Sequence, residues 1–291
     1  MGASPTISSR GRPFPLRSVR PCQIFMRTVL LLAGILIASD VALQSRGHEG
    51  SNPGQGPTLD RPVDRVAFLP SVIIWAWDRP EDLRFLRSKG IGVSFLAETL
   101  TLSGDTVRMR PRLHPLKVTP GTPLIACARV ETDTIFPPTL TAGQVSAAAS
   151  ALARLTALDG VIAIQVDFDA TRSERTFYAA LLRELRRQPP PTMPLSITAL
   201  ASWCAGDPWI ASLPIDEAVP MLFRMGPDAQ DVRLALAQGV DFSLPVCRKS
   251  VGISTDETIP TLPSGRRRYV FRPEGWSQAA VRSLLAEEGK P

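Results

Sequence analysis

Two aspartates, Asp167 and Asp169, stand one residue apart at the end of the apolar run GVIAIQVDFDAT, residues 160–171. Residues i and i+2 of a β-strand point to the same side, so the two carboxyl groups would lie close together. Close carboxylates raise one another's pKa, which lets one of them hold a proton near neutral pH and act as a general acid. The alternative is a structural role, in which Asp169 caps the next helix or pairs with Arg172 or Arg175.

The tryptophans form a second pattern, because all five fall at or just beyond the predicted carboxyl ends of strands: Trp75, Trp77, Trp203, Trp209 and Trp276. Indole faces stack on apolar faces of ligands such as sugars, and aromatic pockets mark small-ligand sites. We therefore expect Trp75, Trp77, Trp203 and Trp276 to line a ligand pocket. Packing at the rim is the alternative for one or two of them.

Charged residues also follow the predicted strands: Asp78, Arg79, Glu98, Glu131, Asp133, Arg224, Arg272 and Glu274. Two carboxyl groups about 5–9.5 Å apart are the equipment that cleaves glycosidic bonds. With Asp169 as general acid and Asp167 tuning its pKa, the expected second carboxylate is Asp78, Glu98 or Glu274. Arg224 is an expected ligand contact.

The candidate site residues follow separate strands, so the fold must bring the carboxyl ends of those strands together. Short apolar runs alternate with helical patterns, which predicts a parallel sheet. Eight strands in roughly 225 residues fit a single-domain (β/α)8 barrel, whose active sites lie at the carboxyl ends of its strands. A doubly wound sheet would want a glycine-rich turn after its first strand, and residues 75–80 hold no glycine. The expected strands are 71–77, 91–96, 123–131, 160–169, 195–203, 217–223, 242–247 and 267–273. The expected helices are 80–90, 141–158, 173–188, 207–213, 227–239 and 277–289, with a hairpin over 98–111.

Composition argues against several classes of protein. The net charge is +6, but the first 27 residues hold five arginines and no acidic residue, so the remainder carries only +1 and no basic patch for nucleic acid. The two histidines, His48 and His114, lie in a predicted linker and a proline-rich loop, which argues against a zinc site or a histidine-based triad. There is no phosphate-binding glycine loop. We predict no metal, no cofactor and no nucleic-acid partner.

The N-terminal region reads as a targeting segment. Residues 26–38, MRTVLLLAGILIA, place an arginine before an apolar run of secretory length, shorter than the ~20 residues of a membrane span. No clean A-x-A cleavage site follows, so a retained anchor is an alternative to a cleaved signal peptide, and a buried N-terminal helix is a third. Residues 44–65 are polar and rich in Gly and Pro, as linkers are. The predicted organisation is a leader at 1–43, a linker at 44–65 and a barrel at 66–291.

Three cysteines fall in the predicted barrel. Cys204 and Cys247 both follow predicted strand ends, so in an exported protein a disulfide across the barrel mouth is one expectation. Two buried thiols are the alternative. Cys127 lies in mid-strand and is expected to be a buried free thiol.

Several runs together resemble one bacterial family. VIIWAWDRPEDLRFL, IQVDFDA, LSITALASWC, VPMLFRMG and FRPEGW are similar to the family known as domain of unknown function 3142, over residues 70–276. The resemblance implies a bacterial protein that is periplasmic or anchored in the inner membrane, and it assigns no activity.

DGVIAIQVDFD also resembles the fourth-strand signature of family 18 chitinases, Asp-Gly-x-Asp-x-Asp-x-Glu, although Asp159-Gly160 matches its opening only if extra residues are inserted. In this likeness Gln165, Asp167 and Asp169 stand for the Asp, the Asp and the acid Glu, which makes Gln165 a ligand contact. Met221 and Phe223 stand near that family's Met and Tyr. Asp169 is one methylene shorter than the Glu, and Phe223 lacks the hydroxyl that assists the substrate's acetamido group. A substrate-assisted mechanism is therefore not implied.

The prediction is a barrel enzyme that acts on a cell-envelope or extracellular polysaccharide. The alternatives are a non-catalytic carbohydrate-binding barrel and a structural envelope protein with a degenerate site.

Overall fold

The computed structural model describes residues 64–86, 90–188, 190 and 192–288. The predicted leader and all of the predicted linker except residues 64 and 65 lie outside the described residues, so their organisation stays a prediction.

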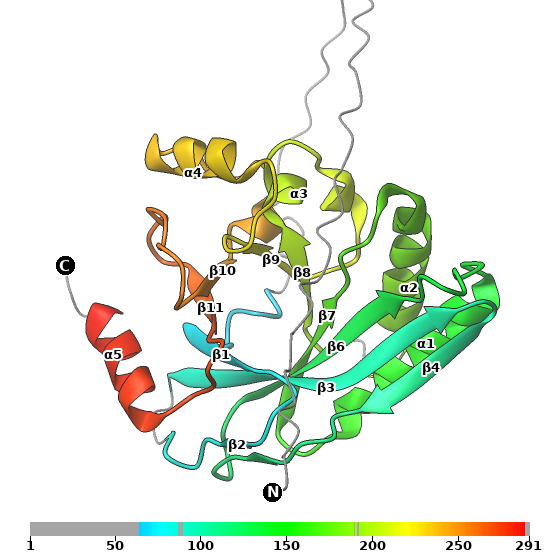
Figure 1. Ribbon diagram of the computed structural model, residues 1–291, viewed down its shortest axis with the longest axis horizontal. Coiled ribbons are helices and arrows are strands. Elements are labelled where there is room, and N and C mark those ends of the chain that lie inside the picture. The colour runs from blue at the N-terminus through cyan, green and yellow to red at the C-terminus, as the bar shows by residue number, and fades with distance from the viewer. Residues whose placement is uncertain (1–63, 87–89, 189, 191, 289–291) are drawn as a thin grey trace, which may run out of the picture. The chain divides into compact units, whose positions relative to one another are not determined.

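Eight parallel strands close into a barrel, which confirms the predicted fold (Figure 1). The sheet order runs β1-β11-β10-β9-β8-β7-β6-β3, and β1 also pairs with β3, which closes the ring. The barrel strands are β1 (Val72–Ala76), β3 (Ile91–Ser103), β6 (Leu124–Thr132), β7 (Val161–Asp167), β8 (Leu195–Leu200), β9 (Glu217–Met221), β10 (Ser250–Ser254) and β11 (Arg267–Phe271). The predicted hairpin is also present, because β4 (Thr106–Pro111) pairs antiparallel with β3.

Helices cover the outside of the strands. They are α1 (Ala142–Arg154), α2 (Arg175–Arg187), α3 (Ala201–Ala205), α4 (Ala229–Ala237) and α5 (Gln278–Glu288). Single turns of 3-10 helix lie at Leu155–Ala157, Arg172–Glu174, Trp209–Ser212 and Pro245–Cys247. Helix α1 begins where the sequence dictates, since Thr141 and Gln144 form a reciprocal capping box.

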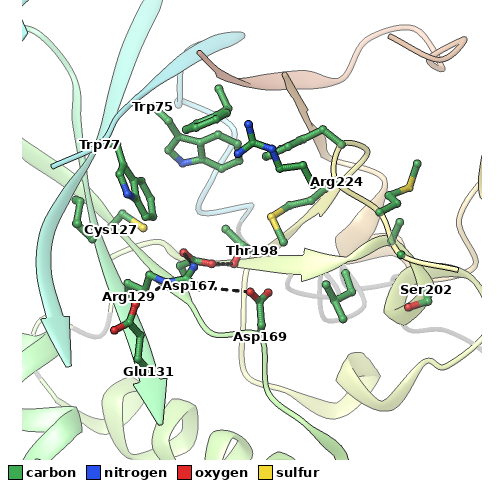
Figure 2. A pocket seen from close by; sticks show the side chains of 18 of the residues that line it. Trp75, Trp77, Cys127, Arg129, Glu131, Asp167, Asp169, Thr198, Ser202 and Arg224 are labelled. Atoms are coloured by element: carbon green, nitrogen blue, oxygen red, sulfur yellow. Dashed lines mark hydrogen bonds and ion pairs between the residues drawn. The ribbon is translucent and has the colours of Figure 1, made fainter. Parts of the chain in front are cut away.

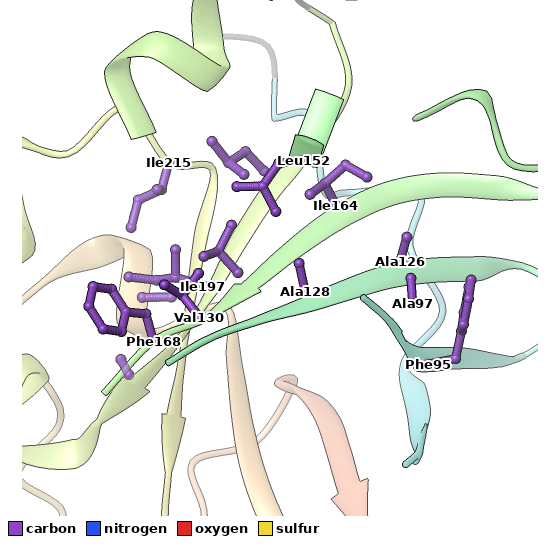
Figure 3. Packing of buried hydrophobic residues seen from close by; sticks show 14 of the residues in the cluster. Phe95, Ala97, Ala126, Ala128, Val130, Leu152, Ile164, Phe168, Ile197 and Ile215 are labelled. Atoms are coloured by element: carbon purple, nitrogen blue, oxygen red, sulfur yellow. The ribbon is translucent and has the colours of Figure 1, made fainter. Parts of the chain in front are cut away.

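The barrel separates two hydrophobic clusters. Alternate side chains of the strands point inward, where Ile73, Ile125, Val219 and Tyr269 fill the interior. The intervening residues point outward and pack against the helices, as Figure 3 shows for Ala126, Ala128, Val130 and Ile164; Leu152 of α1 belongs to the same cluster. This inward and outward alternation decides which residues near the strand ends reach the barrel mouth.

Two predicted elements are wrong. The predicted helix at 80–90 is replaced by β2 (Glu81–Asp82), which pairs with β5 (Leu116–Lys117), followed by a turn. The amides of Glu81 and Leu83 donate to the carbonyls of Pro115 and Lys117, which holds this segment extended beside β5.

The predicted seventh strand at 242–247 is also displaced, since the barrel strand is β10. Pro245 lacks an amide donor and begins a 3-10 turn instead. Gly252 interrupts the β-propensity of β10 and hides this strand from sequence patterns.

Candidate active site

A cavity of about 660 Å³ opens at the carboxyl ends of the barrel strands (Figure 2). Residues of β1, β3, β4, β6, β7, β8, β9 and β11 and of the loops that follow them line it. Six of the residues predicted for the site are among the lining residues: Trp75, Trp77, Asp78, Asp167, Asp169 and Arg224.

Asp167, the last residue of β7, forms the polar floor of the cavity. It is 4% exposed, and both carboxylate oxygens are engaged. Thr198 on β8 donates a hydrogen bond of 2.7 Å to Oδ1, and Arg129 on β6 donates one of 2.6 Å to Oδ2. A buried carboxylate needs such partners, because an unpaired buried charge is strongly unfavourable.

Asp169 lies two residues beyond the strand, at the mouth, where 48% of its side-chain surface is exposed. Its Oδ2 is 3.6 Å from the guanidinium of Arg129. Burial in the recess, followed by repulsion from Asp167, raises the pKa of Asp169, and Arg129 opposes that shift. The pKa of this carboxyl is therefore displaced in the direction that suits a proton donor.

The alternative structural role of Asp169 is filled by other residues. Thr171 and Glu174 form the capping box that starts the helical segment after β7. Arg175 pairs with Asp207. Asp169 is therefore left facing the cavity.

Arg129 is a central site residue that the sequence analysis missed. Its guanidinium contacts three carboxylates: Asp167, Asp169 and Glu131, whose Oε1 is 3.1 Å from Nε. Cys127, Arg129 and Glu131 alternate along β6 and all line the cavity. The signal was present in this period of two, which places charged side chains on the inward face of an otherwise apolar strand.

An aromatic wall extends from Trp75 through Phe223 to Phe271. The centroids of Trp75 and Phe223 are 6.1 Å apart, and Phe223 stacks on Phe271 at 5.7 Å. The Arg224 guanidinium lies 5.0 Å from the centroid of Phe271 and extends the wall. Such surfaces accommodate the apolar faces of ring-shaped ligands.

Arg224 adopts a left-handed backbone conformation, with φ of 49°. This is an unfavourable region for a side chain larger than glycine. Glu257 holds it there by accepting a hydrogen bond of 2.9 Å from the Arg224 amide. Strained residues of this kind concentrate at functional sites.

Trp75 is fixed from below by Gln165, which accepts a hydrogen bond of 2.9 Å from the indole. Gln165 is completely buried inside the barrel, beneath the residues that line the cavity. Gln165, predicted as a ligand contact, therefore supports Trp75 and does not line the cavity. Gly252 leaves room for the ring, since a Cβ at that position would lie 3.1 Å from the indole.

Asp78 lines the cavity but is tightly engaged. It accepts hydrogen bonds from Arg110 at 2.9 Å and from the amide of Leu113 at 3.4 Å, and His114 Nδ1 lies 3.1 Å away. Burial alone would raise the pKa of Asp78, but the bonds from Arg110 and His114 outweigh it and lower the pKa to about 2.

Four other predicted site residues do not line the cavity: Glu98, Glu274, Trp203 and Trp276. A register shift between Leu96 and Glu98 turns Glu98 to the outer, helix-facing side of β3, opposite Ala128. Glu274 is largely exposed and pairs with Arg272.

The two tryptophans are buried packing residues. Trp203 packs edge-to-face on Trp209, and Trp276 donates a hydrogen bond to the carbonyl of Trp75. Trp276 thus supports the site from outside the cavity.

Cys204 and Cys247 form a disulfide, with 5.9 Å between their Cα atoms. Both are fully buried in the outer hydrophobic cluster, so the bond joins α3 to the turn before β10 and does not cross the mouth. Cys127 is the buried free thiol expected, and burial raises its pKa.

Within the described ranges, no three His, Cys, Asp or Glu side chains are grouped so that they could hold a metal ion. The part of the chain that the structure describes also contains no helix long and apolar enough to cross a membrane.

The fold and the position of the cavity define the class of protein. It is a (β/α)8 barrel whose cavity lies where active sites of this fold are found. The structure is similar to a crystal structure described as "putative Chitinase A from Streptomyces coelicolor", with a TM-score of 0.51 and 10% sequence identity. The match covers 76% of this chain and 97% of that chain, and at this identity it shows a shared fold alone. No family model and no curated protein matches the chain, so membership of domain of unknown function 3142 stays a prediction.

Proposed function

We propose that this chain is an exported or membrane-anchored glycoside hydrolase that acts on a polysaccharide of the cell envelope or its surroundings. One observation carries the proposal. Asp169, a carboxyl group with a raised pKa, faces a cavity that has one aromatic wall and lies at the usual catalytic end of a barrel. The barrel architecture shared with a chitinase-like neighbour agrees with this chemistry.

In this proposal, Asp169 donates a proton to the oxygen of the scissile bond. Asp167 keeps Arg129 in place, and its charge maintains the raised pKa of Asp169. Trp75, Trp77, Phe223 and Phe271 hold the sugar rings by stacking, and Arg224 contacts polar groups of the ligand. An oxocarbenium-like transition state would be stabilised by the nearby carboxylates.

Export is part of the proposal. A buried disulfide is expected of proteins that fold in an oxidising compartment. The arginine and apolar run at 26–38 supplies a route there, as signal or anchor, followed by the linker at 44–65.

The test is a panel of reducing-end-labelled oligosaccharides and 4-nitrophenyl glycosides, incubated with the full chain. We expect cleavage of at least one compound. Asp169→Asn should lower kcat on the oligosaccharide by ~10²–10⁴-fold, as loss of a general acid does, with little change in binding measured by calorimetry.

The pH profile gives an independent check. A general acid must be protonated, so kcat of the wild type should fall as the pH rises through the pKa of Asp169. That limb should be absent from Asp169→Asn, because the variant has no acid at this position. Its residual turnover is measured on 4-nitrophenyl glycosides, whose leaving group needs little protonation. Binding of a panel member without any cleavage would replace the hydrolase by the carbohydrate-binding alternative. Absence of both cleavage and binding would favour a structural envelope protein with a degenerate site.

A further inference from the structure

We propose that Glu131 is the second catalytic carboxylate and acts as the general base that activates water. This inference rests on the proposed hydrolase function. Residue patterns in the sequence favoured Asp78, Glu98 or Glu274 for that role, and the structure points to a different strand.

Glu131 lies on β6, one inward position beyond Arg129. In the pairing of β6 with β7, Arg129 is opposite Asp167. Glu131 and Asp169 each lie two residues further along, so they leave neighbouring strands at the same height. Adjacent strands are about 4.8 Å apart, which places both side chains at one edge of the cavity. Figure 2 shows both at the cavity, on either side of Arg129.

A single guanidinium fixes the relative position of the two carboxyl groups. Glu131 Oε1 is 3.1 Å from Nε of Arg129, and Asp169 Oδ2 is 3.6 Å from its Nη2. The rigid guanidinium keeps these two oxygens no more than roughly 9 Å apart, below the ≈ 9.5 Å upper limit for glycosidase carboxylate pairs. This is the preorganisation that a water-activating pair needs.

The other carboxylates are less suited to act as the base. Asp167 uses both oxygens in bonds to Thr198 and Arg129. Asp78 is bound by Arg110 and His114. Asp228 lines the cavity but is exposed in the loop before α4, and no contact in the described residues ties it to Asp169.

Glu131 differs from all three. Its side chain is 49% exposed, and Arg129 engages only Oε1, so Oε2 is free among the described residues to accept a proton. Its carboxylate is therefore both positioned and accessible.

The step balances in atoms and charge. Water forms a bond from its oxygen to the anomeric carbon and gives a proton to Glu131. The glycosidic C–O bond breaks, its electron pair goes to the leaving oxygen, and Asp169 protonates that oxygen. Solvent then returns both residues to their starting protonation states.

The experiment uses the full chain and the 4-nitrophenyl glycoside that the wild type cleaves. Glu131→Gln should lower kcat by ~10²–10⁴-fold, whereas Asp169→Asn should lose much less on this activated substrate because the leaving group needs little protonation. For Glu131→Ala, added sodium azide should restore turnover and yield a glycosyl azide, because the small anion attacks in place of activated water. A merely structural role for Glu131 would not produce that product.

Glu274→Gln and Glu274→Ala are the matched controls, since Glu274 is also an exposed carboxylate beside an arginine but lies outside the cavity. They should keep wild-type kcat and show no azide product. Thermal melts of each variant check folding. Near-wild-type kcat in Glu131→Gln, or azide rescue in Asp228→Ala instead of Glu131→Ala, overturns the assignment while the hydrolase remains. A wild type that cleaves no compound overturns the proposed function itself.

Discussion

Substitution of Arg129 should reveal how much of the stability of this barrel depends on compensating buried negative charge. Arg129→Gln leaves Asp167, whose side chain is 6% exposed, with Thr198 as its remaining hydrogen-bond donor. Removing one partner of a fully buried ion pair costs about 3–5 kcal/mol. Since 31% of the Arg129 side chain is exposed and water can reach the gap, about 2–3 kcal/mol is expected here. For a domain of this size that corresponds to a decrease in Tm of about 5–10 °C.

Thermal and urea unfolding of the full chain at pH 7 measures this loss, with the signal of the barrel followed by near-UV circular dichroism.

Arg108→Gln is the matched control. Arg108 also pairs with an aspartate, Asp133, at 2.8 Å, but its side chain is 63% exposed. Asp133 keeps bonds from Ser103 and from two backbone amides. This control should lose ~0–1 kcal/mol. The reasoning is refuted if Arg129→Gln is no less stable than Arg108→Gln.

Two further outcomes follow from buried groups outside the cavity. The disulfide closes a sequence separation of 43 residues, so Cys204→Ser/Cys247→Ser should lower the free energy of unfolding by about 4 kcal/mol in urea titrations. Reductant should scarcely affect the stability of this double variant. Equal stability of the wild type with and without reductant would contradict this. Burial raises the pKa of Glu98, so its ionisation opposes folding as the pH rises. Glu98→Gln should therefore raise Tm at pH 8 but not at pH 4, and a uniform shift would show that charge is not the cause.

The parts of the site that sequence patterns predicted are those governed by local rules. Asp167 and Asp169 could be placed because an apolar run of alternating burial ends at them, and strand ends in a parallel barrel meet at one rim. Trp75, Trp77 and Asp78, at the carboxyl end of the first strand, could be placed for the same reason. Helix α1 could be located from its Thr141 and Gln144 cap.

Other residues could not be placed from local patterns. One irregularity in β3 turns Glu98 away from the mouth, since a shift of a single residue exchanges the two faces of a strand. Trp203 and Trp276 also follow strands, yet their rings pack into the outer layer. Arg129 and Glu131 follow the inward alternation of β6, but the pairing of Arg129 with Asp167 and Asp169 depends on β6 lying beside β7.

The sequence by itself determined most of the alternation of strands and helices, the barrel that this alternation predicts and the end at which Asp167, Asp169, Trp75 and Trp77 lie, because burial periodicity acts between residues close in the chain. Only the tertiary structure decided which acids share a cavity and which cation holds them. That choice depends on strand register and on side chains from β6, β7 and β8 meeting across the barrel, and no local pattern encodes those distances.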